Sequence, residues 1–251
     1  MAEAFALSTL SLEVVRDLGG PPWLVAERAA AWERFSAGEL PTEAEEVWRY
    51  SRVDDLDLDR FRAGPVAGAD PTGVPPGPVA DLEARAATVV VDNGVVSAVE
   101  VPDEAARAGL RITPFRQLEQ LGDGAPAFGE VAGSADVFVD LSTALCADGV
   151  LVEVAPGAVV TGPIVVTHRL AGEGAMVATR TVVRAGPNSQ ASVVEELSSS
   201  GETMLVLPVL ELDLAEGANL DYAFVQTLGR RAWQIGYQGS RVGRDASLRS
   251  L

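Results

Sequence analysis

The side chains that most often carry chemistry are scarce in this chain of 251 residues. It contains one cysteine, Cys146, one histidine, His168, and no lysine, so that all 19 basic side chains are arginines. The lack of lysine excludes a P-loop lysine, a Schiff-base nucleophile and a lysine general base. One cysteine and one histidine also exclude an intrachain disulfide and any metal site that needs several cysteines or two histidines.

The remaining candidates are the cysteine, the histidine and three carboxylates. Cys146 follows a leucine in a helical pattern, which favours a small buried apolar residue over a nucleophile. His168 follows an apolar run and is predicted to cap a strand rather than to bind a metal. Glu195, Glu196 and Asp221 lie on strand-like segments and could assist iron binding, although solvated positions on a sheet face are the favoured interpretation. We therefore assign no catalytic, cofactor-binding or metal-binding residue from the sequence.

Two motifs near the N-terminus resemble functional sites only at first sight. The run 54–59 holds four aspartates but lacks the glycine and the distal glutamate of an EF-hand loop. Because leucines alternate with the aspartates, we predict an extended segment with one solvated acidic face. Thr42 and Glu45 form a capping-box pattern, which predicts a short helix. Trp48 and Tyr50 at its end are expected to pack as part of a helical cap rather than to stack on a cofactor.

The charge balance limits the possible partners. Acidic side chains number 36 against 19 basic ones, a formal net charge of −17, which opposes binding to nucleic acid or to an anionic membrane. Five arginines gather in the segment 229–249, where we interpret them as solvated residues on a sheet face. The N-terminus lacks a signal-peptide pattern, and no apolar run approaches the roughly 20 residues of a membrane span. We therefore expect a cytoplasmic protein.

The segment 149–251 organises the chain. Short runs of Val, Ile, Leu and Thr, separated by Gly, Pro and Asn, predict strands. A turn in which alanine precedes an apolar residue recurs at Ala158, Ala191, Ala218 and Ala246, at intervals typical of solenoid repeats. One coil cannot bury its inner face alone, so stacked coils would share an apolar interior. We predict a right-handed parallel β-helix, with a β-sandwich as the alternative.

The chain before this segment is expected to be helical at first and mixed α/β later. Helices are predicted at 9–18 and after a Pro-Pro pair, the second with Val25, Ala29 and Trp32 on its buried face. The segment 63–80 has the composition of a Pro/Gly linker without periodicity. The predicted domains are an N-terminal helical domain at 1–62, the linker at 63–80, a mixed α/β region at 81–148 and the β-helix core at 149–251.

In the mixed region the clearest signal is Asn93-Gly94, which joins two apolar runs and predicts a β-hairpin over 87–101. The other predicted elements are a helical turn near 103–108, a strand at 110–113, a helix near 114–121, a loop at 122–133 and a helix at 136–147 with Phe138, Leu141 and Leu145 inward.

Several motifs together point to a family. The N-terminal segments PPWLVAERAAAWERFSAGELPT (21–42) and EEVWRYSRVDDLDL (45–58) come first, followed by VVVDNGVVSAVEV (89–101). DLSTALCADGVLVEVAPGAVVTGPIVV (140–166) and FVQTLGRRAWQIGYQGSRVGRDASL (224–248) follow. This series resembles the SufB/SufD family of iron–sulfur cluster assembly proteins, and its helical part is more similar to the SufD branch than to the SufB branch. One mild difference is Leu141-Ser142, where the family usually has Leu-Asn.

The resemblance implies a non-catalytic scaffold subunit of a SufBCD-like complex, which supports cluster assembly and iron acquisition together with SufB-like and SufC-like subunits. A cluster held by four thiolates cannot form on one cysteine, so this chain would hold a cluster only transiently and with partners. Because the chain stops at Leu251 within a strand pattern, we expect an N-terminal portion with an incomplete β-helix. Such an open end is expected to self-associate.

Two other β-helix functions were considered. A polysaccharide lyase would combine clustered acids with a basic residue that abstracts a proton. The acidic excess fits that class, but the chain has no lysine and no matching basic cluster. A β-helix acyltransferase would need short hexapeptide repeats, which the sequence lacks. The scaffold is therefore the preferred hypothesis and the lyase is the alternative.

Overall fold

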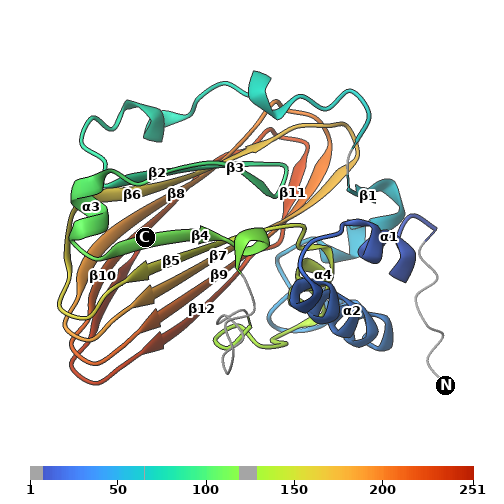
Figure 1. Ribbon diagram of the computed structural model, residues 1–251. Coiled ribbons are helices and arrows are strands. Elements are labelled where there is room, and N and C mark those ends of the chain that lie inside the picture. Colours follow the sequence, from blue (N-terminus) through green and yellow to red (C-terminus); the bar gives the residue numbers. More distant parts are fainter. Residues whose placement is uncertain (1–7, 65, 119–128) are drawn as a thin grey trace.

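Two β-sheets face each other across a shared interior (Figure 1). The computed structural model describes residues 8–64, 66–118 and 129–251. Sheet A comprises β1 (Arg62–Ala63), β4 (Leu110–Pro114), β5 (Val150–Val154), β7 (Ala175–Ala185), β9 (Met204–Leu214), β11 (Ala232–Gln234) and β12 (Tyr237–Val242). Sheet B comprises β2 (Ala87–Asp92), β3 (Val95–Glu100), β6 (Val159–Leu170), β8 (Gln190–Ser199), β10 (Asn219–Thr227) and β13 (Ser247–Ser250).

From β5 onward, successive strands alternate between the two sheets, with β11 and β12 as two pieces of one coil in sheet A. Within each sheet, β6 pairs in parallel with β8, β8 with β10, β5 with β7, and β7 with β9. Each coil therefore contributes one strand to each sheet. This topology confirms the predicted parallel β-helix, because a β-sandwich would be built mainly from antiparallel neighbours.

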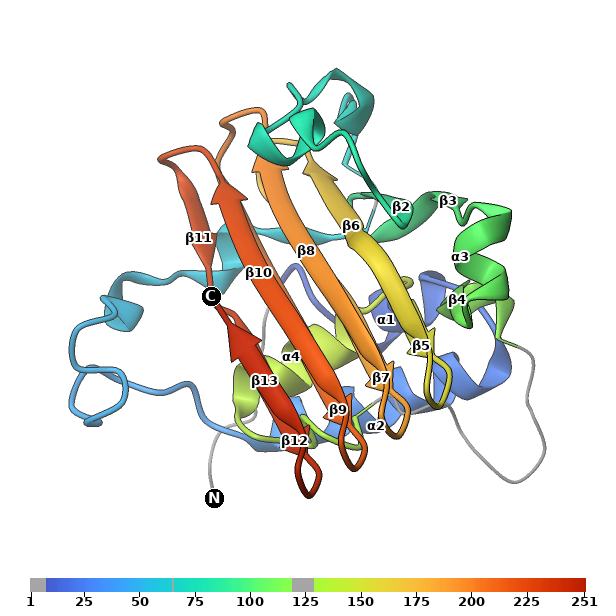
Figure 2. The same cartoon turned by 90° about the vertical axis from the view of Figure 1, so that its left-hand side faces the viewer.

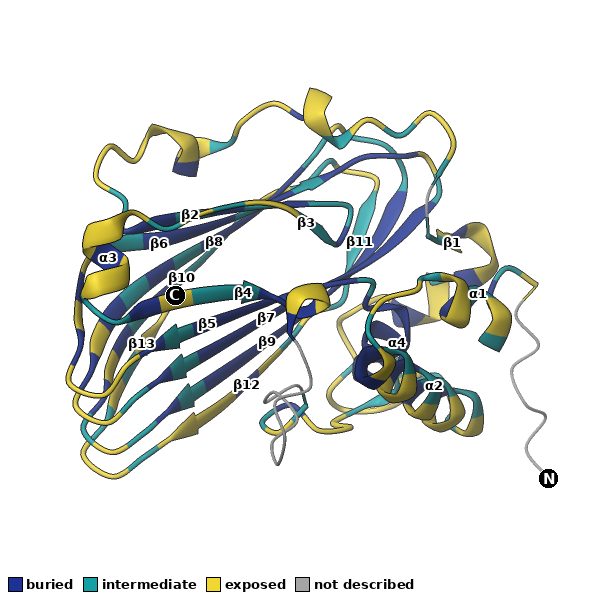
Figure 3. Cartoon of the chain, viewed as in Figure 1, coloured by how far each residue is buried: buried dark blue, intermediate teal, exposed yellow. Residues whose placement is uncertain are grey.

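The interior is formed by every second residue of each strand, as the alternation of side chains in a β-strand requires. Ile164 of β6, Val193 of β8 and Tyr222 of β10 stand in register and are each at most 3% exposed. Figure 3 shows this burial along the strands, with exposed residues at the turns below them. Because neighbouring strands lie about 4.8 Å apart, each inward side chain packs on its equivalents in the coils above and below.

The turns that lead from sheet A to sheet B form a stack of corners. In each corner a backbone N–H donates to the carbonyl three residues earlier, namely Ala158 to Ala155, Ser189 to Gly186, Ala218 to Ala215 and Ala246 to Gly243. Ser189 therefore takes the corner position of its coil, and the prediction of Ala191 at that position is wrong. Ala191 lies within β8, where it pairs with Leu220. Serine replaces alanine there because both are small enough for the crowded corner.

Three helices lie beside the outer face of sheet A (Figure 1), namely α1 (Leu12–Asp17), α2 (Pro22–Ala37) and α4 (Val137–Leu145). The Asp136 carboxylate caps α4 by accepting from the Val139 N–H at 2.8 Å. Phe138, Leu141 and Leu145 are buried, as predicted. Every helix among the described residues is too short or too polar to traverse a lipid bilayer.

The buried face of α2 is shifted by one position along the helix from the predicted face. The buried residues are Trp23, Leu24, Arg28, Ala31 and Phe35, whereas Val25, Ala29 and Trp32 are only half-buried. The difference arises because Arg28 points inward, where its guanidinium donates to the carbonyl oxygens of Cys146 and Gly19. An apolar-periodicity argument does not count an arginine as part of the buried face.

The short helix predicted from the capping box of Thr42 and Glu45 is absent, and the segment 43–52 forms turns instead. The Thr42 N–H donates to Glu45 Oε1 at 3.0 Å, which is one of the two hydrogen bonds of a capping box. No helix follows this bond. A helix of so few residues does not recover the cost of its first turn. Trp48 packs on Phe138 with ring centroids 5.3 Å apart, but Tyr50 is 93% exposed, so its predicted packing is wrong.

The aspartate run 54–59 is not extended as predicted. It folds into two 3₁₀ turns, Val53–Asp55 and Leu58–Arg60, which bury Val53 and Leu58. The aspartate side chains instead accept hydrogen bonds from nearby backbone groups, such as Asp57 from the Asp59 N–H at 3.1 Å. These local bonds compete with an extended backbone and favour turns.

The Pro/Gly segment crosses the outer face of sheet B (Figures 1 and 2). Its residues 71–81, which we call the strap, contain two 3₁₀ turns, Pro71–Gly73 and Pro78–Asp81. Val74 and Val79 of the strap are buried. A side chain at Gly77 would collide with the Glu196 carboxylate, so glycine allows the strap to lie directly on β8.

The predicted hairpin is present, with Asn93 (φ 45°) and Gly94 (φ 80°) in the turn between β2 and β3. β2 pairs in parallel with β6, and β4 pairs antiparallel with β5, so the mixed region extends both sheets. The short helix α3 (Asp103–Arg107) connects these strands. Only a 3₁₀ turn, Phe115–Gln117, occurs where a helix near 114–121 was predicted. Residues 119–128, which include the rest of that helix and much of the predicted loop, lie outside the described residues.

Candidate functional site

A cluster of polar side chains lies inside the β-helix, where the other residues are mainly apolar. Its members are His168 of β6, Thr181 of β7, Glu195 of β8 and Tyr222 of β10, each at most 3% exposed. They come from successive coils and are 13 to 54 positions apart in the chain. The parallel coils bring them together because inward positions recur at the same height in each coil.

Glu195 is the centre of the cluster. Its Oε1 lies 2.7 Å from His168 Nε2 and accepts the Thr181 hydroxyl at 2.9 Å. Its Oε2 accepts the Tyr222 hydroxyl at 2.8 Å. Three side-chain donors therefore converge on one buried carboxylate, and the short distances are typical of hydrogen bonds to a charged acceptor.

The electrostatic balance favours an ionised Glu195. Burial alone would raise the pKa of its carboxyl, but the His168 hydrogen bond and charge, with the bonds from Tyr222 and Thr181, hold that pKa below its usual value. Burial and the neighbouring Glu195 carboxylate raise the pKa of Tyr222, so its phenol keeps its proton and remains a donor. The cluster thus places one negative charge in the interior and surrounds it with donors.

Two buried polar atoms beside this cluster have no hydrogen-bond partner among the described residues, namely His168 Nδ1 and Thr179 Oγ1. Because Nε2 faces the Glu195 carboxylate, the opposite ring nitrogen, Nδ1, is the His168 atom left to interact with another polar group. A cavity of about 280 Å³ adjoins the cluster and is lined by Glu195, Tyr222 and Phe224, together with Gln234 and Gln238 of the last coil. The interior is therefore more polar towards this coil.

The side chains of this cluster do not form a metal centre by themselves. Among the described residues, no group of three or more His, Cys, Asp or Glu side chains is placed to hold a metal ion. One imidazole and one carboxylate could contribute to a site only with further ligands.

The structure corrects the predictions for His168 and Glu195. His168 was expected to cap a strand, but it lies within β6 and points inward, and Glu195 is buried rather than solvated. The sequence contained the signal for both. Ile164, Val166, His168 and Leu170 alternate along one face of a strand, and so do Val193, Glu195 and Leu197. Alternation should have outweighed the general tendency of charged residues to be exposed.

Glu196 is also buried, at 1% exposure, so its predicted solvation is wrong as well. It points to the outer face of sheet B, and the strap covers it. Burial raises the pKa of its carboxyl, and the Val79 N–H opposes this rise only in part. No composition rule predicts this burial, because the strap comes from more than a hundred residues earlier in the chain.

The two other candidates occupy the environments that were predicted. Cys146 is buried beside α4, where its thiol donates to the Asp148 carbonyl at 3.0 Å. Burial raises the pKa of this thiol to about 12, so it remains protonated and unreactive. Asp221 lies half-exposed on β10 and forms an ion pair with Arg249 of the next coil.

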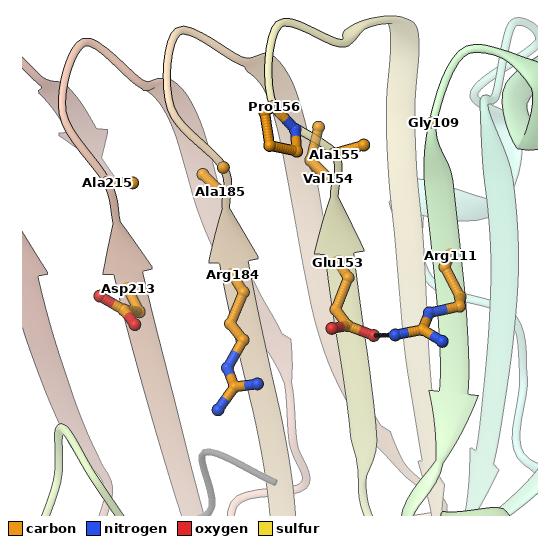
Figure 4. Close-up of a pocket in the computed structure, with 11 residues that line it drawn as sticks. Gly109, Arg111, Glu153, Val154, Ala155, Pro156, Arg184, Ala185, Asp213 and Ala215 are labelled. Atoms are coloured by element: carbon orange, nitrogen blue, oxygen red, sulfur yellow. Dashed lines mark ion pairs between the residues drawn. The ribbon is translucent and has the colours of Figure 1, made fainter. Parts of the chain in front are cut away.

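Alternating charges form a row across the outer face of sheet A, which we call the charge row. Its members stand in register on neighbouring strands, namely Arg111, Glu153, Arg184, Asp213 and Arg241. Figure 4 shows Arg111 and Glu153 paired, with Arg184 and Asp213 further along the row. These residues line a hollow of about 390 Å³. The Arg241–Asp213 pair is 2.6 Å long. All five arginines of the segment 229–249 are exposed, as predicted, but only Arg241 and Arg249 lie on strands, whereas Arg230, Arg231 and Arg244 lie in turns.

The comparison with known families adds an independent observation. Residues 168–251 match the family model described as "SUF system FeS cluster assembly, SufBD core domain". The match covers about a third of the chain and includes His168, Glu195 and Tyr222. No curated protein matches the chain. The match supports a relationship to the SufB/SufD family.

Proposed function

We propose that this protein is a SufD-type member of the SufB/SufD family and acts in the cytoplasm as a non-catalytic scaffold of iron–sulfur cluster assembly. The observation that carries the proposal is the match of residues 168–251 to the SufBD core domain, because these residues fold into successive coils of one β-helix. The segment Trp48-Arg49-Tyr50 and its surroundings favour the SufD branch.

The chemistry of the described residues fits a scaffold better than a catalyst. His168 and Glu195 are engaged with each other in the interior, and the Cys146 thiol is buried with a raised pKa. Cysteine binds metals and attacks substrates as the thiolate, which this environment disfavours. We therefore infer that iron and sulfide are held only transiently by this subunit, with most ligands supplied by its partners.

The partners that this role requires are SufB-like and SufC-like subunits. The net charge of −17 disfavours nucleic acid and anionic membranes as alternatives. The last described coil presents strand edges at β12 and β13, and such edges pair readily with another chain. We include self-association through this coil in the proposal.

Co-purification with SufB-like and SufC-like proteins tests the scaffold role. We expect a stable complex whose assembly supports cluster formation, and no cluster on this chain alone. Arg241 lies on β12, one of the strand edges of the last described coil, so Arg241→Glu should weaken the binding of a subunit that pairs with this edge. Arg107→Glu, on the remote helix α3, is the matched control and should leave this binding unchanged. Failure to bind either subunit, together with cleavage of an acidic polysaccharide, would replace the scaffold by the lyase. Sedimentation of the isolated chain tests self-association separately, which a strictly monomeric profile at high concentration contradicts.

A further inference from the structure

A second hollow, of about 590 Å³, lies at the edge of the β-helix opposite the stacked corners. It is bounded by residues just before and just after β1 and by the turns from β6 to β7 and from β8 to β9. Its lining includes Arg60, Arg62, Val66, Glu173 and Thr203. Its volume lies within the usual range for small-molecule sites.

The walls of this hollow are fixed by backbone hydrogen bonds. The Arg62 N–H donates to the Gly174 carbonyl at 2.8 Å, and the Gly174 N–H donates to the Thr203 carbonyl at 2.8 Å. β1 also pairs with the start of β7, so that Arg62 stands beside Ala175. The backbone of Arg62 is therefore held by the β-helix, and Arg60 lies two residues earlier, at the end of a 3₁₀ turn.

The arginines of this hollow differ from those of the charge row in lacking acidic partners. Arg60 and Arg62 are exposed, and neither has a hydrogen bond from its side chain or an ion pair within 4 Å among the described residues. Arg60 ends the 3₁₀ turn Leu58–Arg60 and Arg62 begins β1, and both residues line this hollow. Two unpaired guanidinium groups in a chain of net charge −17 form a local positive site.

The acidic residues nearby do not cancel this charge. Hydrogen bonds from Thr203, and then the field of Arg231 and Arg60, lower the pKa of Glu173, which stays ionised. Its carboxylate lies 3.7 Å from the Arg231 guanidinium and also interacts with the charge of Arg60, so this one carboxylate is shared between two arginines. Glu202 accepts from the Ser200 hydroxyl and does not line the hollow. An excess of positive charge therefore remains at Arg60 and Arg62.

The geometry points to an anion site at Arg60 and Arg62 that binds the phosphate group of a small molecule. Guanidinium groups match phosphate oxygens with paired N–H donors and bind phosphate more specifically than a point charge does. Ala63 and Val66 supply an apolar wall, and they also border a neighbouring hollow of about 550 Å³ that could hold the organic part of the ligand. The negative field of the whole chain opposes anion binding, so the affinity must come from these local contacts and should fall with added salt.

Titration with inorganic pyrophosphate tests this site, by calorimetry and ³¹P NMR at about 50 mM NaCl, where screening is moderate. We expect saturable binding to the full chain. Arg60→Gln/Arg62→Gln should weaken it at least about tenfold, since both charged contacts are lost. Arg49→Gln/Arg107→Gln removes the same charge from remote exposed positions and should change it less than about twofold. Glu173→Gln removes a nearby negative charge and should tighten binding.

Three results would overturn the inference. The first is the absence of saturable binding by a chain whose far-ultraviolet circular dichroism shows it to be folded. The second is an equal loss in the two double variants, which indicates attraction by net charge alone. The third is tighter binding of a polyglutamate peptide than of pyrophosphate through the same arginines, which makes the ligand an acidic protein segment. None of these results depends on the role in cluster assembly.

Discussion

Replacing Glu195 by alanine would remove the common acceptor of the interior cluster. His168 Nε2, the Thr181 hydroxyl and the Tyr222 hydroxyl would each lose their partner. A buried donor left unpaired costs about 1–3 kcal/mol, and breaking a buried ion pair by removing one member costs about 3–5 kcal/mol. Because these contributions overlap, we expect Glu195→Ala to lower the free energy of unfolding by about 3–5 kcal/mol.

Urea unfolding followed by circular dichroism measures this change, provided that the slope with denaturant is the same in both proteins. Glu195→Gln serves as the close variant. It keeps an acceptor for two donors but removes the charge, so a smaller loss of about 1–2 kcal/mol is expected. Glu216→Ala, at an exposed corner, is the surface control and should stay within about 0.5 kcal/mol of the parent.

The pH dependence gives the same test a second readout. The folded state holds the pKa of Glu195 below its ordinary value of about 4.3, so its stabilisation is complete above that value and is lost as the pH falls through the folded pKa. The parent protein should therefore lose stability more steeply than Glu195→Gln below about pH 4. The reasoning is refuted if Glu195→Ala costs less than about 1 kcal/mol, or if the two acid profiles run in parallel.

Three further predictions concern single positions. Cys146 should resist a thiol reagent at pH 8 in the folded protein and react on unfolding, because its pKa is raised to about 12; rapid labelling without unfolding contradicts this. Glu196→Gln should raise the melting temperature at pH 7 but not at pH 4, because burial raises the pKa of this carboxyl and its ionised form destabilises the folded protein as the pH rises. The expected gain in the free energy of unfolding at pH 7 is about 1 kcal/mol, and an equal effect at the two pH values contradicts the prediction. Gly94→Ala should destabilise by about 2 kcal/mol in urea, because φ is 80° and the new methyl group would lie 2.6 Å from the Ala178 carbonyl oxygen; an unchanged midpoint contradicts it.

The features that follow from local chemistry could be predicted from the sequence. Asn93-Gly94 determines the hairpin because the turn needs two residues with positive φ. The Asp136 cap and the spacing of Phe138, Leu141 and Leu145 determine α4. The parallel β-helix followed from the recurrence of strands and small corner residues, even though one corner position was assigned two residues too late.

The features that depend on distant segments could not be predicted in the same way. Glu196 is buried only because the strap covers it, and nothing near Glu196 in the sequence reveals that cover. Arg28 faces inward because the carbonyl oxygens of Gly19 and Cys146 receive its guanidinium. Glu195 is different, since its alternation with Val193 and Leu197 was visible and a composition rule was wrongly preferred. The partners of Glu195 still required the register of four strands, which the sequence does not specify residue by residue.

The charge row also affects the order in which the coils assemble. If β5 paired with β9 and left out β7, Glu153 would stand beside Asp213, and if β7 paired with β12, Arg184 would stand beside Arg241. Omitting a coil therefore brings like charges together on the outer face, while the apolar residues inside are too similar to distinguish one coil from the next. The alternation of sign disfavours a skipped turn, so the solvated surface adds to the topological fidelity that the interior obtains only at the Glu195 cluster.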